Sequence, residues 1–265
     1  MKRKPKLGQN FLIDDRARHA IADALGDVSK RTVIEIGPGH GAITDILVPR
    51  AGRLIALELD RELAPALAVR FSDHPHVEVL EQDVLKVDLA TIISPGETAD
   101  VIGNLPYYIT SDILLKLFAA GSAGLLARAV VMMQREVADR ISASPGVRDY
   151  GLLSATAQMN AHVENLFTLP PSAFSPPPAV HSTVLRLTFA PRFVELNVDA
   201  TEFDRFLKQS FAQKRKTLEN NLRAAGFTTA QLAESWPAGI LRQARAESLE
   251  LEEMAQLYRA FTAAK

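Results

Sequence analysis

The stretch GNLPYYIT, residues 103–110, places an amide side chain beside an apolar residue, a proline and two tyrosines. It follows ADVI, residues 99–102, a short apolar run that predicts a strand ending where the amide appears. A proline ends a strand ladder, but a turn requires no tyrosine. Asn104 and Tyr107 are therefore the first candidates for chemistry in this sequence.

A second candidate is VIEIGPGHGAIT, residues 33–44, in which a predicted strand leads into three glycines and then a helix. Such a turn allows the backbone to approach a nucleotide-like ligand at the carboxyl end of the strand. The glycine spacing differs from the G-x-G-x-x-G pattern of pyrophosphate sites, and Pro38 lacks the N–H that a phosphate would use. This spacing disfavours the competing interpretation, a nicotinamide-dependent dehydrogenase.

Two acidic residues follow at the ends of the next predicted strands. Glu58 lies in RLIALEL about twenty residues after the glycine turn, where an acid can accept from both ribose hydroxyls. Asp83 follows HVEVL and is placed to accept from an adenine amino group. Ligand groups at three successive strand ends describe an adenosine without a diphosphate, a pattern that resembles S-adenosylmethionine-dependent methyltransferases.

The Asn104-to-Tyr107 corner would then lie beside the donated methyl group. The lone pair of an exocyclic adenine amine is delocalised into the ring, so the amine is a poor nucleophile. An amide oxygen and a backbone carbonyl that both accept from it would aim the lone pair at the methyl. Pro106 stiffens the turn that supplies this carbonyl, and Tyr107 offers a ring on which a base can stack. We therefore expect catalysis by positioning, on a base that has left its stack or is single-stranded.

The elements that must position these groups alternate between strands and helices. The β-branched runs are TVIEI, RLIALEL, HVEVL, ADVI and RAVVMM, with helical segments such as residues 43–51 and 111–120 between them. This alternation predicts a parallel sheet covered on both faces. Two further extended segments, residues 151–169 and 181–189, bring the strands to seven and favour an antiparallel final pair. Residues 170–180 between them are too proline-rich for either element.

After residue 199 no strand pattern occurs. Residues 203–226 predict a basic helix that stops at a glycine, with further helices beyond it. We therefore expect a mostly parallel, Rossmann-like α/β domain over residues 1–195 and a smaller helical domain over residues 199–265.

Composition limits the function classes. The 265 residues include no cysteine, which excludes disulfides and thiolate metal sites and indicates a reducing cytoplasm. The six histidines are scattered, no segment approaches eighteen apolar residues, and the basic start lacks a signal-peptide core. We therefore expect neither a metal site nor a membrane span. The net charge of −1 weakens a nucleic-acid interpretation without excluding it, because MKRKPK and residues 208–223 are locally basic.

Eight motifs in order resemble the ribosomal RNA adenine dimethyltransferase family, and within it the bacterial small-subunit branch that dimethylates two adjacent adenosines. They are GQNFL, EIGPGHGAIT, LELDREL, QDVL, GNLPYYIT, QREVADRI with its downstream YG, PPSAFSPPPAVHS and FAQKRKTLENNL. The resemblance implies the class I methyltransferase fold, S-adenosylmethionine as cofactor, and small-subunit rRNA within an immature ribosomal subunit as partner. It also implies a cytoplasmic protein, which we expect to be monomeric.

The resemblance also assigns residues. The implied cofactor contacts are Gln9, Asn10, Leu12, Gly37, Gly39, Glu58, Leu59, Asp83, Val84 and Asn104, and the implied catalytic set is Asn104, Leu105, Pro106, Tyr107 and Phe174. Phe174 would sandwich the target base against Tyr107, and Tyr108 would pack beneath that loop. Lys214, Arg215 and Lys216 would meet rRNA phosphates, although a charge run is usually a solvated face.

Two rival functions remain. One is an antibiotic-resistance methyltransferase that acts on an adenine of large-subunit rRNA. The C-terminal QKRKTLENNL and the faintly acidic charge disfavour it, because those enzymes are usually strongly basic. The other is a nucleic-acid-binding factor that has kept the fold and lost activity. The intact Glu58, Asp83 and NLPY corner argue against lost catalysis.

Overall fold

The structure is a computed structural model that describes residues 10–263. Gln9 and the basic arm before it lie outside the described residues. By their internal contacts, the described residues form two compact units. The first comprises residues 10–138 and 162–189, and the second comprises residues 139–161 and 190–263. Each unit is considered separately below.

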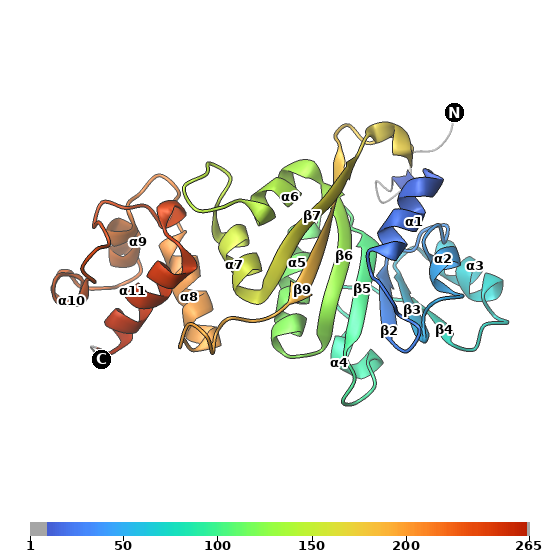
Figure 1. Cartoon of the computed structure of the whole chain (residues 1–265), viewed down its shortest axis with the longest axis horizontal. Coiled ribbons are helices and arrows are strands. Elements are labelled where there is room, and N and C mark those ends of the chain that lie inside the picture. Colours follow the sequence, from blue (N-terminus) through green and yellow to red (C-terminus); the bar gives the residue numbers. More distant parts are fainter. Residues whose placement is uncertain (1–9, 264–265) are drawn as a thin grey trace. The chain divides into compact units, whose positions relative to one another are not determined.

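The first unit contains a seven-stranded sheet in the order β4-β3-β2-β5-β6-β9-β7 (Figure 1). The strands are β2 (Thr32–Ile36), β3 (Arg53–Glu58), β4 (Val77–Glu81), β5 (Ala99–Asn104), β6 (Leu126–Gln134), β7 (Ala161–Leu169) and β9 (Ser182–Phe189). Strands β2 to β6 pair in parallel, and β9 runs antiparallel to β6. The predicted seven-stranded, mostly parallel sheet is therefore confirmed.

Burial explains why the central runs form strands. All five residues of β2 are buried, which fits a strand with both sheet faces covered. The helices of this unit are α1 (Asp15–Asp23), α2 (Thr44–Leu47), α3 (Leu63–Arg70), α4 (Leu89–Ile92) and α5 (Thr110–Ser122), and α6 (Arg135–Ser142) begins where β6 ends. The helix predicted over residues 43–51 is shortened to α2, and Pro49 follows its end, as expected of a residue that disfavours helical continuation.

The order of the strands indicates where in the sheet a ligand would bind. From β2 the chain runs outward to β3 and β4 on one side, and the connection after β4 returns to β5 on the other side of β2. In such open sheets a ligand binds outside the carboxyl ends of the strands at this switch point. The glycine turn, Glu58 and Asn104 all lie at that edge, because each ends or follows one of these three strands.

A small second sheet joins two segments far apart in the sequence. Strand β1 (Phe11–Leu12) pairs antiparallel with β8 (Phe174–Ser175), which follows the short 3-10 helix η1 (Pro171–Ala173). The amide of Ile13 donates to the carbonyl of Ala173 over 2.9 Å and extends the pairing. The N-terminal segment is thus fastened to the proline-rich loop.

The second unit is helical, with a core of its own. Its helices are α7 (Leu152–Asn160), α8 (Ala200–Ser210), α9 (Leu218–Ala224), α10 (Thr229–Ser235), the 3-10 helix η2 (Ala246–Ser248) and α11 (Leu251–Ala263). Phe203 lies edge-to-face against Tyr258, with ring centroids 5.4 Å apart, and Phe206 packs beside both. As expected, no strand occurs between residue 190 and residue 263.

Two expectations need correction here. The segment 151–169 is not one extended stretch, because its first part forms α7 and only its second part forms β7. The hydroxyl of Ser154 accepts from the Gly151 amide over 3.0 Å and caps α7, a local signal that the apolar run obscured. Residues 139–161 also belong to the second unit by their contacts, whereas the predicted boundary left them in the first.

The predicted basic helix over residues 203–226 is also wrong. Helix α8 ends at Ser210 and α9 begins only after Thr217, whose hydroxyl accepts from the Asn220 amide. The side-chain amide of Asn221 donates to the carbonyls of Ser210 and Gln213, over 2.7 and 3.2 Å, and thereby satisfies backbone at the end of α8. The cations at positions 214–216 therefore lie in a turn between two helices.

Candidate active site

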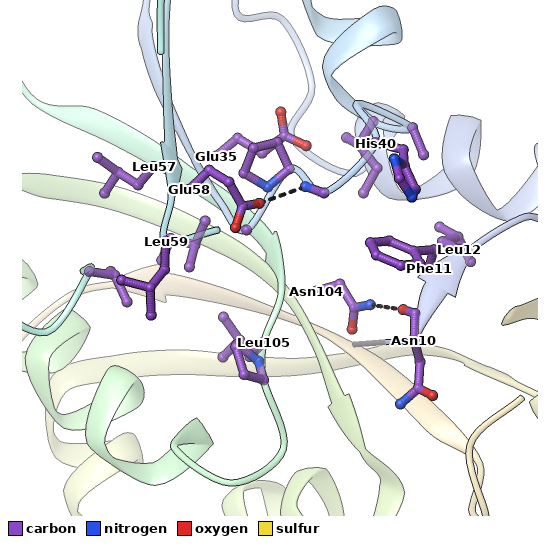
Figure 2. Close-up of a pocket in the computed structure, with 18 of the residues that line it drawn as sticks. Asn10, Phe11, Leu12, Glu35, His40, Leu57, Glu58, Leu59, Asn104 and Leu105 are labelled. Carbon is purple, nitrogen blue, oxygen red and sulfur yellow. Dashed lines mark hydrogen bonds between the residues drawn. The ribbon is translucent and has the colours of Figure 1, made fainter. Parts of the chain in front are cut away.

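A cavity of about 420 Å³ lies in the first unit, where the site residues gather at the carboxyl edge of the sheet. Its walls come mainly from the segments 10–13, 35–40, 57–59, 82–84 and 104–109. These segments are the N-terminal strand, the glycine turn and the ends of β3, β4 and β5 (Figure 2).

Most of the predicted site residues meet in this cavity. The lining includes Asn10, Leu12, Gly37, Gly39, Glu58, Leu59, Asp83, Val84, Asn104, Leu105, Pro106 and Tyr107. Phe174 is not among the lining residues, and positions 214–216 belong to the second unit. Gln9 lies outside the described residues.

Glu58 is a buried acid that fixes the shape of the glycine turn. Its Oε2 accepts from the Gly39 amide over 2.9 Å (Figure 2), and its Oε1 accepts from the Asp60 amide over 2.9 Å. A carboxylate offers about four acceptor positions, so these two bonds leave others for a ligand. The carboxylate is thus oriented before any ligand arrives.

The glycine turn brings backbone close to the N-terminal strand. Gly39 has a φ of +60°, and a Cβ there would lie 3.0 Å from the Phe11 ring. The Phe11 ring itself lies 4.3 Å from the His40 ring, measured between centroids. Glycine is therefore required at position 39 by its backbone angle and by the aromatic ring above it.

Asp83 follows β4 and is half-buried at the cavity wall. Its Oδ1 accepts from the Leu85 amide over 2.9 Å, which orients the carboxylate within the loop. The ammonium of Lys116, on α5, donates to the carbonyls of Leu85 and Val87 and holds the same loop from outside.

Asn104 carries an acceptor that the fold leaves unused. Its Nδ2 donates to the Asn10 carbonyl over 3.0 Å (Figure 2). Its Oδ1 is buried and has no hydrogen-bond partner among the described residues. A buried acceptor without a partner costs about 1 to 3 kcal/mol. Because Asn104 lines the cavity, its Oδ1 is a candidate acceptor for a donor group on a ligand.

The backbone of the corner is held from two sides. The Leu105 amide donates to the Met132 carbonyl over 2.9 Å. The Pro106 carbonyl accepts from the Thr110 hydroxyl over 2.9 Å and from the Ile109 amide over 3.2 Å. The Leu105 carbonyl is therefore the more available acceptor beside Asn104.

The two tyrosines differ in their surroundings. The Tyr107 hydroxyl lies 2.7 Å from the Ser182 hydroxyl, and its ring is half-buried at the cavity wall. Burial raises the pKa of the Tyr107 phenol above its ordinary value, so the group is a neutral phenol at neutral pH. Tyr108 is 62% exposed at the mouth of the cavity, and the expectation that it packs beneath the loop is wrong.

Phe174 occupies a different place from the one expected. The side chain is only 2% exposed and packs in the hydrophobic core with Leu12, Leu169 and Ala173. Phe174 is the register partner of Leu12, and both side chains belong to the same buried cluster. In this structure it does not form the second half of a base sandwich.

Glu35 is a cavity residue that the sequence analysis missed. It lies in β2 just before the glycine turn, is fully buried, and its Oε2 has no hydrogen-bond partner among the described residues. Burial, together with the nearby charges of Asp45 and Glu58, raises the pKa of this carboxyl to about 7, although Thr44 acts to lower it. The sequence does contain a sign of this residue's role, because Glu35 is an acid within the otherwise apolar run TVIEI.

Comparison with known proteins shows to which family the chain belongs. The sequence profile of the family described as ribosomal RNA adenine dimethylase matches residues 1–263. The chain belongs to this family. It is therefore an rRNA adenine methyltransferase of the class I fold, with S-adenosylmethionine as methyl donor.

Similar sequences support this assignment. A ribosomal RNA small subunit methyltransferase A from Acidobacterium capsulatum is 59% identical over 259 residues, which are 97% of this chain and 91% of that protein. One of the same name from Koribacter versatilis is 54% identical over 269 residues, 97% of this chain and 93% of that protein.

Two solved structures share the fold. A dimethyladenosine transferase from Plasmodium falciparum superposes with a TM-score of 0.76 at 24% identity, covering 93% of this chain and 95% of that one. The 23S rRNA methyltransferase ErmE superposes with a TM-score of 0.69 at 24% identity, covering 96% of this chain and 100% of that one. In residues 10–263, no helix is long and apolar enough to cross a membrane, and no group of acidic residues and histidines could hold a metal ion.

The raised pKa of Glu35 generates a stability prediction. Between its ordinary value of 4.5 and the folded value of about 7, the folded chain keeps a proton that the unfolded chain releases. The free energy of unfolding should therefore fall as the pH rises through this window, by on the order of 3 kcal/mol for this group. Glu35→Gln should lose this part of the pH dependence, measured by urea unfolding at pH 4.5 and pH 8. An identical dependence in both proteins would contradict the assignment.

Proposed function

We propose that this protein dimethylates the 6-amino groups of two adjacent adenosines in a loop near the 3′ end of small-subunit rRNA. Its substrate is an immature ribosomal small subunit in the cytoplasm, and it acts as a monomer. The names of its relatives support the choice of subunit. The observation that carries the chemistry is the unpartnered Oδ1 of Asn104 at the cavity wall, which is an acceptor suited to an amine.

The cavity suits the methyl donor. S-adenosylmethionine, when bound, supplies a methyl group already activated on sulfur. Glu58 receives the ribose hydroxyls, because its carboxylate is oriented and has acceptor positions left. Asp83 accepts from the adenine amino group, and Leu59 and Val84 line the cavity as apolar surface beside it. Glu35 is the buried acid able to balance positive charge on the donor.

Asn104 and the Leu105 carbonyl together form an acceptor pair for the target amine. The Pro106 carbonyl is excluded from this role because it already accepts from two donors. Two acceptors on the amine hydrogens hold the nitrogen nearer to tetrahedral, with its lone pair aimed at the methyl carbon. The Asn104 amide cannot rotate freely, because its Nδ2 is held by the Asn10 carbonyl. Catalysis then rests on positioning and needs no general base.

The target base is held on Tyr107. A base that reaches this cavity has left its stack, and an aromatic ring compensates for the lost stacking whatever the base. The neutral phenol of Tyr107 supports stacking and argues against a tyrosinate acting as base.

The turn at 214–216 supplies phosphate contacts. Lys214 donates to the Arg148 carbonyl over 2.8 Å, and within residues 10–263 none of the three cations forms an ion pair with an acid. Other cations of the second unit are paired, for example Lys208 with Asp204 and Arg223 with Glu219. Unpaired cations in an exposed turn are suited to phosphates.

A methyl-transfer assay tests the proposal as a whole. The protein is given immature small subunits, large-subunit rRNA, or no RNA, with labelled S-adenosylmethionine. We expect up to four methyl groups per small subunit and none on large-subunit rRNA. Transfer to large-subunit rRNA alone would support the antibiotic-resistance function, and binding without transfer would support a catalytically silent factor.

Glu58→Ala should weaken cofactor binding. Ribose hydroxyls would face no acceptor, which costs about 1.5 to 3 kcal/mol. Calorimetric titration with S-adenosylmethionine should therefore show a Kd about 10- to 150-fold higher. Glu81→Ala is the matched control, because Glu81 is the register partner of Glu58 on β4 but does not line the cavity. Equal affinities in the two variants would remove Glu58 from the cofactor site.

Asn104→Ala should abolish most of the chemistry without unfolding the protein. Losing one positioned polar group costs about a hundredfold in turnover or more. Single-turnover methyl transfer on immature small subunits measures this, with thermal melts to verify folding. Asn220→Ala, an exposed change in the second unit, is the control. A folded Asn104→Ala protein with the wild-type rate would refute the acceptor pair.

Neutralising Lys214, Arg215 and Lys216 together should weaken binding to the small subunit and reduce its salt dependence. Each lost phosphate contact lowers the slope of log K against log salt by about 0.7 to 0.9. Neutralising the ion-paired Arg205, Lys208 and Arg223 removes equal charge from the same unit and is the control. If both triple variants show the same slope, the turn is a plain solvated face.

A further inference from the structure

The Tyr107 hydroxyl lies beside Ser182, the last residue of the motif PPSAFSPPPAVHS. Its oxygen lies 2.7 Å from the hydroxyl of Ser182, the first residue of β9. Ser182 is 0% exposed and does not line the cavity, so it touches neither ligand nor solvent. Within residues 10–263, the structure shows no other hydrogen bond for the Tyr107 hydroxyl or the Ser182 hydroxyl.

The bond spans the edge of the sheet. Tyr107 follows β5, Ser182 begins β9, and β6 lies between these strands. The register pairs Ser182 with Gln134, the last residue of β6, so Ser182 lies at the same carboxyl edge as the cavity. Because neighbouring strands are about 4.8 Å apart, the tyrosine reaches across roughly 10 Å of sheet edge to its partner.

Hydrogen bonds already fix the backbone next to Tyr107, so the orientation of the Tyr107 ring depends on its side-chain torsion angles. The Leu105 amide and the Pro106 carbonyl are both hydrogen-bonded within the fold. The side chain is only half-buried, and Tyr107 lines the cavity. A half-buried ring without a polar anchor would turn about χ1 and χ2, and a base stacked on it would turn with it.

We propose that Ser182 is a positioning residue for methyl transfer, holding the Tyr107 ring in the plane on which the target adenosine stacks. The proposal rests on the proposed function. It assigns the phenol hydroxyl an anchoring role, which explains why a stacking surface here is a tyrosine and not a phenylalanine. Since Ser182 follows the loop of residues 176–181, the bond also ties the ring to the end of that proline-rich loop.

The test compares Ser182→Ala, Tyr107→Phe and the double variant. Each single change breaks the bond, so each should lower the single-turnover rate on immature small subunits by about three- to tenfold, the scale of one neutral hydrogen bond. The double variant should be no slower than the slower single variant, because both changes remove the same interaction and the pair leaves no hydroxyl unpartnered. The Kd for S-adenosylmethionine should not change.

Thr183→Val is the matched control. The Thr183 hydroxyl lies 3.0 Å from the Thr168 hydroxyl, so this change breaks a similar bond one residue along β9, and neither threonine lines the cavity. It should lower the melting temperature about as much as Ser182→Ala and leave the transfer rate unchanged. A merely structural role for Ser182 would make the two variants alike.

Each result of this comparison either supports or overturns the positioning role of Ser182. Wild-type rates in Ser182→Ala and Tyr107→Phe, additive losses in the double variant, or an equal loss in Thr183→Val would overturn the proposal. If Ser182→Ala does not fold, Tyr107→Phe tests the same bond from the other side. Wild-type protein that transfers no methyl to small subunits would overturn the proposed function as well, whereas active wild type with unaffected variants overturns the Ser182 role alone.

Discussion

The hydrogen bond from the Asn104 side chain to the Asn10 carbonyl is the interaction on which the site depends. It joins residues 94 positions apart and determines which end of the amide is left without a protein partner. With Nδ2 committed to the N-terminal strand, the oxygen is the atom left for a ligand. A free amide could present a donor, and a donor would repel the amine hydrogens that the reaction must hold.

The two buried acids at the cavity, Glu58 and Glu35, differ in their hydrogen bonding. Glu58 uses both oxygens to hold the backbone on either side, so it shapes the glycine turn as well as offering acceptors. Glu35 has an oxygen without a partner in a fully buried position, and its pKa is raised accordingly. The charged form of Glu58 is stabilised by the two amides, whereas burial favours the neutral form of Glu35.

Much of this arrangement could be predicted from the sequence because the signals were local. Continuous β-branched runs marked the strands, and the acid or amide at each strand end necessarily met its neighbours at one sheet edge. Other features depend on contacts between distant residues. The break between α8 and α9 comes from the Asn221 amide reaching back to Ser210. The burial of Phe174 follows from pairing with a strand more than 160 residues earlier, and no window of sequence around Phe174 contains that strand.

The pairing of β1 with β8 has a thermodynamic consequence. Residues 10–12 border the cavity that suits the methyl donor, and residues 173–175 begin the loop that leads to Ser182. Each strand is only two residues long, and its backbone groups are satisfied by the other. A ligand that orders one segment therefore lowers the entropy lost when the other is ordered, and linkage makes the effect reciprocal. The order of the segment at the cavity is in this way coupled to the order of the proline-rich loop through a ribbon of four residues.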